Sequence, residues 1–467
     1  MREPSHGPSV ASAVATDKGE TVSISVDYDH PLLKLKRALP WEAICAVLIR
    51  RWRAAGKNVD GGPGLGWDVS LYGPLVVLMV VKNFSSRQME AYVSENVVAR
   101  VFIARQHDPT PQIRDHANIA RAYAALGKEG VEEINALILH AAKRFGFADP
   151  RRLSADTTAQ ELPIGYPNEP GILRGIAQRC VRALEKLKKK GVGGIESTIE
   201  QARRVLRSVK EHHLFAKAQE EKQQVLRRII TETEPLMAHT HHVVTILGQP
   251  LERVKSAAIN TLKTMQEVAT RLIPQIIQWM TTGVVAKGKI LHAGLPQARA
   301  IVRQKPGKKV EFGLRYLLNR IGGGYLFGTV VLASPDESKM PLLSLTCYRE
   351  IFGQQAVPEL LVYDRGGYAT STLKKLAKEG IKQVGIQPKG KGAWLVAEEV
   401  RETIRSERGK TEGSIGTLKT AKYGFNKPRE RHWQTLQMAG PRSILSFNLN
   451  KLMRDLMKAQ QALPVTH

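Results

Sequence analysis

Strand patterns occur in two places far apart in this sequence, and their separation limits the folds that the chain can adopt. One short strand candidate lies near residues 153–158, and the others begin at Val310. Residues 174–305, between them, carry long helical patterns instead. We therefore predict an α/β domain, formed by residues 151–173 and 306–458, whose first strand is separated from the rest by a helical insertion.

The later strands have distinct patterns. Val310–Leu318 and Tyr325–Ala333 flank the glycine-rich Arg320–Gly324, which is typical of a hairpin. Leu360–Tyr363 is a short, continuous apolar run, as expected of a strand buried on both faces. The remaining predicted elements are a helix at Ser371–Glu379, a strand at Ile381–Ile386 and a helix at Trp394–Thr420.

The N-terminal part of the chain has no strand pattern. Residues 1–27 are small and polar, which indicates a flexible tail, and residues 28–150 form a predicted helical region. Within it, Ser85–Ala104 and Pro111–Leu126 resemble two helices joined by a turn, with a serine cap at position 85 or 86. This pair fits either a DNA-reading helix-turn-helix or an accessory helical bundle. The glycines of Asp60–Gly66 are interpreted as a turn, since no Lys-Ser/Thr follows them.

The insertion carries two apolar seams that resemble a coiled coil. Their residues repeat at three-to-four spacing in residues 195–209 and again in residues 258–279. Gly248, Gln249 and Pro250 separate the seams, so we predict an antiparallel helical hairpin. Residues 174–230 contain 15 Lys and Arg against 6 Glu, and this one-sided excess favours contact with phosphates over a merely solvated face.

The composition of the whole chain supports a polyanionic partner. The 467 residues include 70 Lys and Arg against 43 Asp and Glu, a net charge of +27, whereas the 42% hydrophobic content excludes a wholly disordered chain. The longest apolar run, Leu71–Val81, is too short to span a membrane, and no signal peptide is recognised. Three widely spaced cysteines exclude a disulfide scaffold, which favours a reducing compartment.

Two aspartates occupy strand ends, where ligands and catalytic groups collect in parallel sheets. Asp156 ends the first strand candidate, and Asp364 directly follows Leu360–Tyr363. If the two strands are neighbours, these carboxylates repel one another unless a cation lies between them. Mg²⁺ prefers oxygen ligands of this kind.

A third acid, Glu412, lies on the predicted helix Trp394–Thr420 among cations. At 100° per residue, Arg405, Arg408 and Lys419 fall on nearly the same face as Glu412. Glycines at 409, 413 and 416 leave room for another backbone to approach. A surface helix with ordinary ion pairs explains this stripe equally well.

Together, these residues resemble the DDE transposases of bacterial insertion sequences, whose core is RNase H-like. The family signature Tyr-(2)-Arg-(3)-Glu-(6)-Lys is matched by Arg408, Glu412 and Lys419, with Arg405 at the tyrosine position. The segments around Asp156, with its following Tyr-Pro, and around Asp364 are also similar to the family. The resemblance covers roughly residues 30–173 and 306–456, but not the helical insertion.

The resemblance implies an RNase H-like mixed sheet with flanking helices and a two-metal phosphoryl transfer that uses Mg²⁺, with Mn²⁺ as a substitute. Asp156, Asp364 and Glu412 are expected to be the catalytic acids and metal ligands. Arg405, Arg408 and Lys419 are expected to contact double-stranded DNA. The first expected step is a nick at the end of the insertion element. The second is strand transfer, which joins the 3′-hydroxyl of the element to target DNA.

The implied partners are the terminal repeats of an element, target DNA and a second copy of the chain, since two DNA ends must be handled together. The implied location is the bacterial cytoplasm, on the nucleoid when DNA is bound. Two alternatives stay open: a related nuclease that does not join strands, and a basic coiled-coil architectural protein without catalysis.

Other polar groups have simpler interpretations. The histidines at 239, 241 and 242 lack a matching carboxylate or cysteine pattern and indicate a polar helix end. Asp336 and Glu337 are placed in a turn between strands, without a ligand role. Trp394 fits core packing better than base stacking, and Lys188–Lys190 fits a solvated helix terminus.

Overall fold

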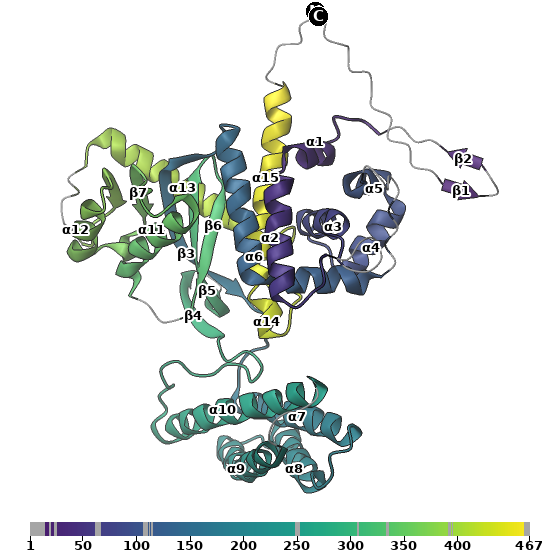
Figure 1. Cartoon of the computed structure of the whole chain (residues 1–467). Coiled ribbons are helices and arrows are strands. Elements are labelled where there is room, and N and C mark those ends of the chain that lie inside the picture. The colour runs from purple at the N-terminus through teal and green to yellow at the C-terminus, as the bar shows by residue number, and fades with distance from the viewer. Residues whose placement is uncertain are drawn as a thin grey trace, which may run out of the picture. The chain divides into compact units, whose positions relative to one another are not determined.

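The computed structural model describes residues 15–17, 20–22, 26–60, 67–105, 111, 113, 115–247, 253–305, 308–332, 336–390, 394 and 396–461. It is a mixed α/β protein that divides into two compact units (Figure 1). Unit 1 comprises residues 1–160 and 315–467, and unit 2 comprises residues 161–314.

The sheet is open and mixed. Its strands are β3 (Asp149–Glu161), β4 (Arg299–Lys305), β5 (Lys308–Gly322), β6 (Leu326–Val331), β7 (Leu360–Tyr363) and β8 (Gln383–Ile386). Its order is β4-β5-β3-β7-β8, and β6 also pairs with β5. The β5–β6 hairpin is antiparallel, whereas β3–β7 and β7–β8 are parallel. The predicted hairpin is therefore confirmed, as is the predicted union of the first strand with the later ones.

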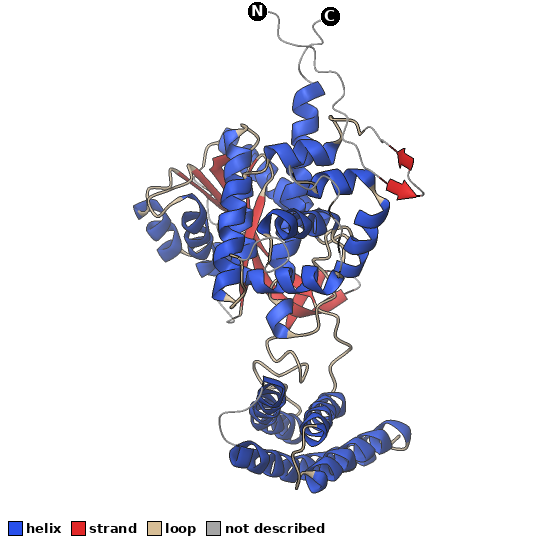
Figure 2. Ribbon diagram, turned by 45° about the vertical axis from the view of Figure 1, so that its right-hand side comes forward, coloured by secondary structure: helices blue, strands red, loops and turns tan. Residues whose placement is uncertain are grey.

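Helices pack against the strands of the sheet in unit 1 (Figure 2). The N-terminal ones are α1 (Pro31–Ala38), α2 (Trp41–Ala54), α3 (Val69–Lys82), α4 (Ser86–Glu95), α5 (Val97–Ile103) and α6 (His116–Arg144). The C-terminal ones are α11 (Met340–Phe352), α12 (Thr370–Lys378), α13 (Glu398–Leu418), α14 (Trp433–Leu436) and α15 (Ala439–Gln461), with the short 3-10 helices η1 (Glu337–Lys339) and η2 (Arg365–Gly367).

One hydrophobic core joins the N-terminal helices to the sheet. It contains Leu48 of α2, Leu78 of α3 and Ile138 of α6 together with Leu153 of β3 and Leu361 of β7. The last helix, α15, packs against α6 and against the first helix, α1 (Figure 1). The boundary expected near residue 150 thus passes through a continuous core.

Local sequence accounts for several N-terminal elements. Ser85 caps α4 in a reciprocal capping box with Gln88, as the serine at this position suggested. The single helix expected over Ser85–Ala104 is instead two, because Asn96 adopts an extended backbone and its side chain caps α5. The structure also pairs β1 (Ala15–Asp17) with β2 (Glu20–Val22) in the segment expected to lack regular structure.

Unit 2 is a four-helix arrangement rather than the predicted hairpin of two helices. Its helices are α7 (Glu169–Lys189), α8 (Glu196–Leu214), α9 (Gln219–Leu247) and α10 (Arg253–Thr282). Both predicted seams are largely buried, on α8 and α10, in a core separate from that of unit 1. Gly191 and Gly194, which have positive φ, separate α7 from α8. In α9, threonines occupy some of the buried positions, so the apolar residues alone do not show a clear helical period.

The turns expected at residues 61–66 and 248–250 lie outside the described residues. Within the part that is described, no single helix has the length and apolar character to cross a bilayer, although α3 and α4 pass that test as a pair bent by 102°.

Candidate functional site at the carboxyl edge of the sheet

Asp156 and Asp364 are brought to neighbouring positions at the carboxyl end of β7, which is called the edge below. Asp364 directly follows β7 as predicted, whereas Asp156 lies inside β3, which continues to Glu161, and not at the end of its strand. The β3–β7 register pairs Arg152 with Leu360 and Ser154 with Val362. Continued by two residues, it sets Asp156 beside Asp364. Neighbouring strands lie about 4.8 Å apart, so the two backbones are adjacent at the point where both carboxylates begin. Asp364 also accepts a hydrogen bond of 2.9 Å from the Gly366 N–H, which fixes the turn after β7.

Helix α13, which carries Glu412, packs across these strands. Ile404 of α13 contacts Leu360 and Val362 on one face of β7. Thr411, next to Glu412, donates a hydrogen bond of 2.8 Å to Ser154, or accepts one from it, and Ser154 lies on the same face of β3 as Asp156. The fold therefore places the helix of the third acid over the strand of the first.

A buried ion pair fixes α13 against the hairpin. Arg320 of β5 donates to Glu407 at 2.7 Å, and their side chains are 9% and 5% exposed. Burial is the main cause that lowers the pKa of Arg320, and the carboxylate of Glu407 opposes it. Lys410 also contacts Glu407, at 3.0 Å. No sequence pattern singled out this pair, because its partners are 87 residues apart.

The four residues predicted on this helix have different surroundings. Glu412 is 67% exposed and lies 3.9 Å from Arg408, one turn before it. Arg408 is close enough to Asp364 for its charge to favour the ionised form of that carboxyl. Arg405 pairs with Glu398 at 3.0 Å, and Lys419 caps the end of α13. The helix itself begins four residues later than predicted, at Glu398 rather than Trp394.

Glu337 belongs to this edge although the sequence placed it in a turn between strands. It begins the short helix η1, which precedes α11. Its carboxylate accepts hydrogen bonds from Thr157 of β3 at 2.9 Å and from the Tyr363 hydroxyl of β7 at 2.7 Å. Arg315 of β5 donates to it at 3.3 Å. Glu337 thus bridges three strands, and no local pattern could reveal these contacts.

Negative charge accumulates at this edge. Burial, followed by the charge of Glu337, raises the pKa of Asp364, while the amides of Gly366 and Gly367 and the charge of Arg408 oppose the rise. The pKa of the Tyr363 hydroxyl is raised by burial and then by Glu337, Asp364 and Asp156. A bound cation would reduce the repulsion among these desolvated carboxylates.

The acids are nevertheless not gathered into a finished metal site. Among the residues that the structure describes, no group of three His, Cys, Asp or Glu side chains is arranged to hold an ion. Asp156 and Asp364 share the edge, whereas the exposed Glu412 lies toward Arg408. The two aspartates therefore offer the oxygen donors that Mg²⁺ prefers, and Glu412 stands on the helix beside them.

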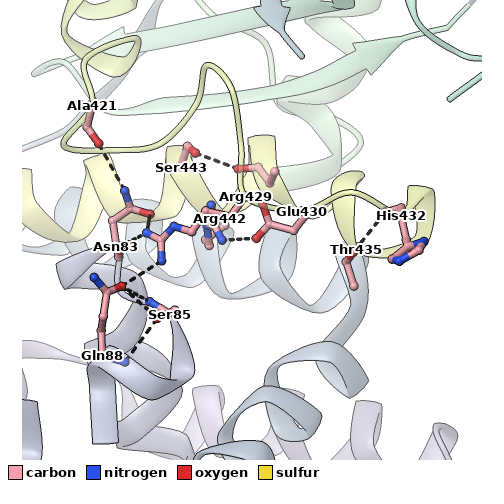
Figure 3. Close-up of polar contacts among 11 residues, drawn as sticks. Asn83, Ser85, Gln88, Ala421, Arg429, Glu430, His432, Thr435, Arg442 and Ser443 are labelled. Atoms are coloured by element: carbon pink, nitrogen blue, oxygen red, sulfur yellow. Dashed lines mark hydrogen bonds and ion pairs between the residues drawn. The ribbon is translucent and has the colours of Figure 1, made fainter. Parts of the chain in front are cut away.

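The loop after α13 is attached to the N-terminal helices. Arg429 donates to the backbone oxygen and the side chain of Asn83, at the end of α3, and to Gln88 of α4 at 3.3 Å (Figure 3). Glu430 forms a buried ion pair with Arg442 of α15. The helix that carries Glu412 is thus connected to the region expected to recognise DNA ends.

Comparisons of the chain with protein-family models, with curated protein sequences and with solved structures find no match.

Proposed function

We propose that this protein is a DNA transposase that cleaves and joins DNA strands with the help of divalent cations. The observation that carries the proposal is the convergence of Asp156, Asp364 and the helix of Glu412 at one edge of the sheet. The mixed sheet, with the strand of Asp156 at its centre, fits an RNase H-like core. The net charge of +27 suits a DNA substrate.

Each group has a definite task in this proposal. Asp156 and Asp364 would hold Mg²⁺, or Mn²⁺ in its place, and Glu412 would complete the ligand set. Two such cations would supply activation of the attacking oxygen and stabilisation of the leaving oxygen. Arg408 and Lys419 contact the phosphate backbone, and Arg405 extends this contact along α13. Glu337 holds Tyr363 and Thr157 in place, so that the strand ends keep their spacing.

The proposed activity also requires recognition of DNA ends and a second copy of the chain. The N-terminal helices recognise the ends of the element, and two copies of the chain act on two paired ends. The reaction takes place in the cytoplasm, on nucleoid DNA. An architectural DNA-binding protein needs the basic surfaces but not the acids, which makes the acids the decisive residues.

The test uses the full chain and DNA that flanks its reading frame on both sides, with labelled 3′-hydroxyl ends and added MgCl₂ or MnCl₂. We expect nicking at the element ends and joining to a second duplex. Asp364→Asn should abolish both steps while DNA binding persists. Asp60→Asn, which changes an exposed aspartate far along the chain, is the matched control and should retain activity.

Cleavage without joining would identify the related nuclease instead. Unaltered behaviour of Asp364→Asn in every assay would refute the catalytic role and leave the architectural alternative.

A further inference from the structure

Unit 2 contains a cavity of about 310 Å³ between the start of α7 and the loop after α10. Its polar lining includes Tyr166, Arg174, Gln178, Arg179, Arg182 and His292. Arg174, Gln178, Arg179 and Arg182 fall on one side of α7, while the opposite side contributes Ile176 and Leu184 to the core. The arginines therefore face the cavity by virtue of their helical spacing.

The positive charge of this cavity is not neutralised. Among the described residues, none of Arg174, Arg179 and Arg182 takes part in an ion pair. Burial and the charge of Arg182 lower the pKa of Arg179, which means that the cations crowd one another. The two acids of α7, Glu169 and Glu185, are already paired with Lys289 and Arg203.

Other arginines of unit 2 have the opposite character. Arg203 pairs with Glu185, Arg207 with Glu200 at 2.7 Å, and Arg228 with Glu211. The arginines of the cavity therefore differ from these three, which each have a carboxylate partner.

Two further side chains suit a nucleic acid. Tyr166 is 83% exposed, and its ring meets that of Phe312 edge to face at 5.6 Å, so the ring has a packing partner and most of its surface is open to a ligand. The Nδ1 atom of His292 is buried without a hydrogen-bond partner among the described residues. Burial, followed by the charge of Arg179, lowers the pKa of His292, which keeps the ring neutral and able to donate or accept a hydrogen bond.

We propose that this cavity binds a DNA strand, with its phosphates on Arg174, Arg179 and Arg182 and an unpaired base stacked on Tyr166. Phosphate contacts and an aromatic platform are the two components of single-strand recognition. The inference deepens the proposed function, because a cut or frayed DNA end supplies such a strand.

The experiment measures binding of the full chain to fluorescein-labelled oligothymidylate in EDTA, over a series of salt concentrations. The variant R174Q/R179Q/R182Q is compared with R203Q/R207Q/R228Q, which removes the same charge from paired arginines of the same unit. The first should lower the slope of log affinity against log salt by about 2, since each single-strand phosphate contact contributes about 0.7. The second should change the slope by less than half as much.

Tyr166→Ala should weaken oligothymidylate binding about 5- to 150-fold, the loss of one base stack. Tyr166→Phe should bind as the wild type does, and binding of blunt duplex should change by less than 2-fold in both. Equal slopes for the two triple variants, or equal losses of single strand and duplex on Tyr166→Ala, would overturn the proposal. Because EDTA removes catalysis, this assay succeeds or fails independently of strand cleavage.

Discussion

Asp364 carries its charge at a half-buried strand end beside Glu337, where burial and a second carboxylate disfavour ionisation. The pKa of this carboxyl is higher in the folded chain than in the unfolded chain. Its ionisation therefore costs folding free energy at neutral pH, and the cost disappears when the pH falls below the unfolded value of about 3.9. Such a cost is typical of a group selected for binding rather than for stability.

Asp364→Asn removes this cost and keeps the hydrogen bond to Gly366. We expect a higher Tm than that of the wild type near neutral pH in EDTA, with the difference shrinking near pH 4. Added Mg²⁺ should make the Tm of the wild type the higher of the two. An ion at a concentration about 100 times its dissociation constant stabilises the protein that binds it by about 2.7 kcal/mol. Thermal unfolding with and without MgCl₂ checks both statements.

A lower Tm for Asp364→Asn at neutral pH would contradict the electrostatic explanation. An equal response of both proteins to MgCl₂ would contradict the assignment of Asp364 as a ligand.

Single residues differ in how far sequence predicts them. The placement of Asp364 could be predicted, because a short apolar run followed by an acid marks the end of a buried strand. Glu337 could not, since its partners Thr157 and Tyr363 are 180 and 26 residues away. The residues next to Glu337 in sequence indicate a turn, but they carry no information about these distant contacts.

At the scale of elements, α13 depends on the buried pair of Arg320 and Glu407. Arg320→Met leaves the buried Glu407 carboxylate without its main partner. Removing one partner of a buried ion pair lowers the free energy of unfolding by about 3–5 kcal/mol. We expect urea unfolding to show a decrease in the free energy of unfolding of about 3 kcal/mol, because Lys410 still contacts Glu407. Arg405→Met, which breaks an exposed pair on the same helix, should cost less than about 1 kcal/mol.

Similar losses for the two arginine variants would show that the buried pair does not hold α13.

The glycines of α13 give a second prediction for this helix. A Cβ added at Gly413 would meet no atom of the chain within 4 Å. Gly413→Ala should therefore raise the free energy of unfolding by about 0.5–1 kcal/mol, because alanine favours the helix. DNA binding should weaken if a phosphate backbone approaches this face, as the proposed function requires. A more stable variant with unchanged DNA affinity would exclude that approach.

Elements with strong local patterns were predicted well. Leu360–Tyr363 has the predicted limits, and α12 and β8 lie within two residues of theirs. Unit 2 was predicted less well, because glycine breaks and buried threonines conceal the division into four helices. Sequence periodicity reports which face of a helix is apolar, but it does not report how many helices share a core.

At the scale of the whole molecule, the two units have separate hydrophobic cores. Leu262 of unit 2 and Leu361 of unit 1 are both fully buried. Each substitution to alanine should destabilise its own unit by about 2–5 kcal/mol. Calorimetry should show two transitions, with Leu262→Ala shifting one and Leu361→Ala the other. A single transition that moves equally in both variants would show that the units unfold together.

The distance along the chain between β3 and β7 has a consequence for biosynthesis. A ribosome that adds about 5–20 residues per second needs about 10–40 s to travel from Glu161 to Leu360. β3 leaves the exit tunnel earlier than β7 by the same interval, during which α7–α10 can already fold. A chain that ends anywhere in this gap contains Asp156 but lacks Asp364, so the length of the nascent chain determines when the two aspartates can come together.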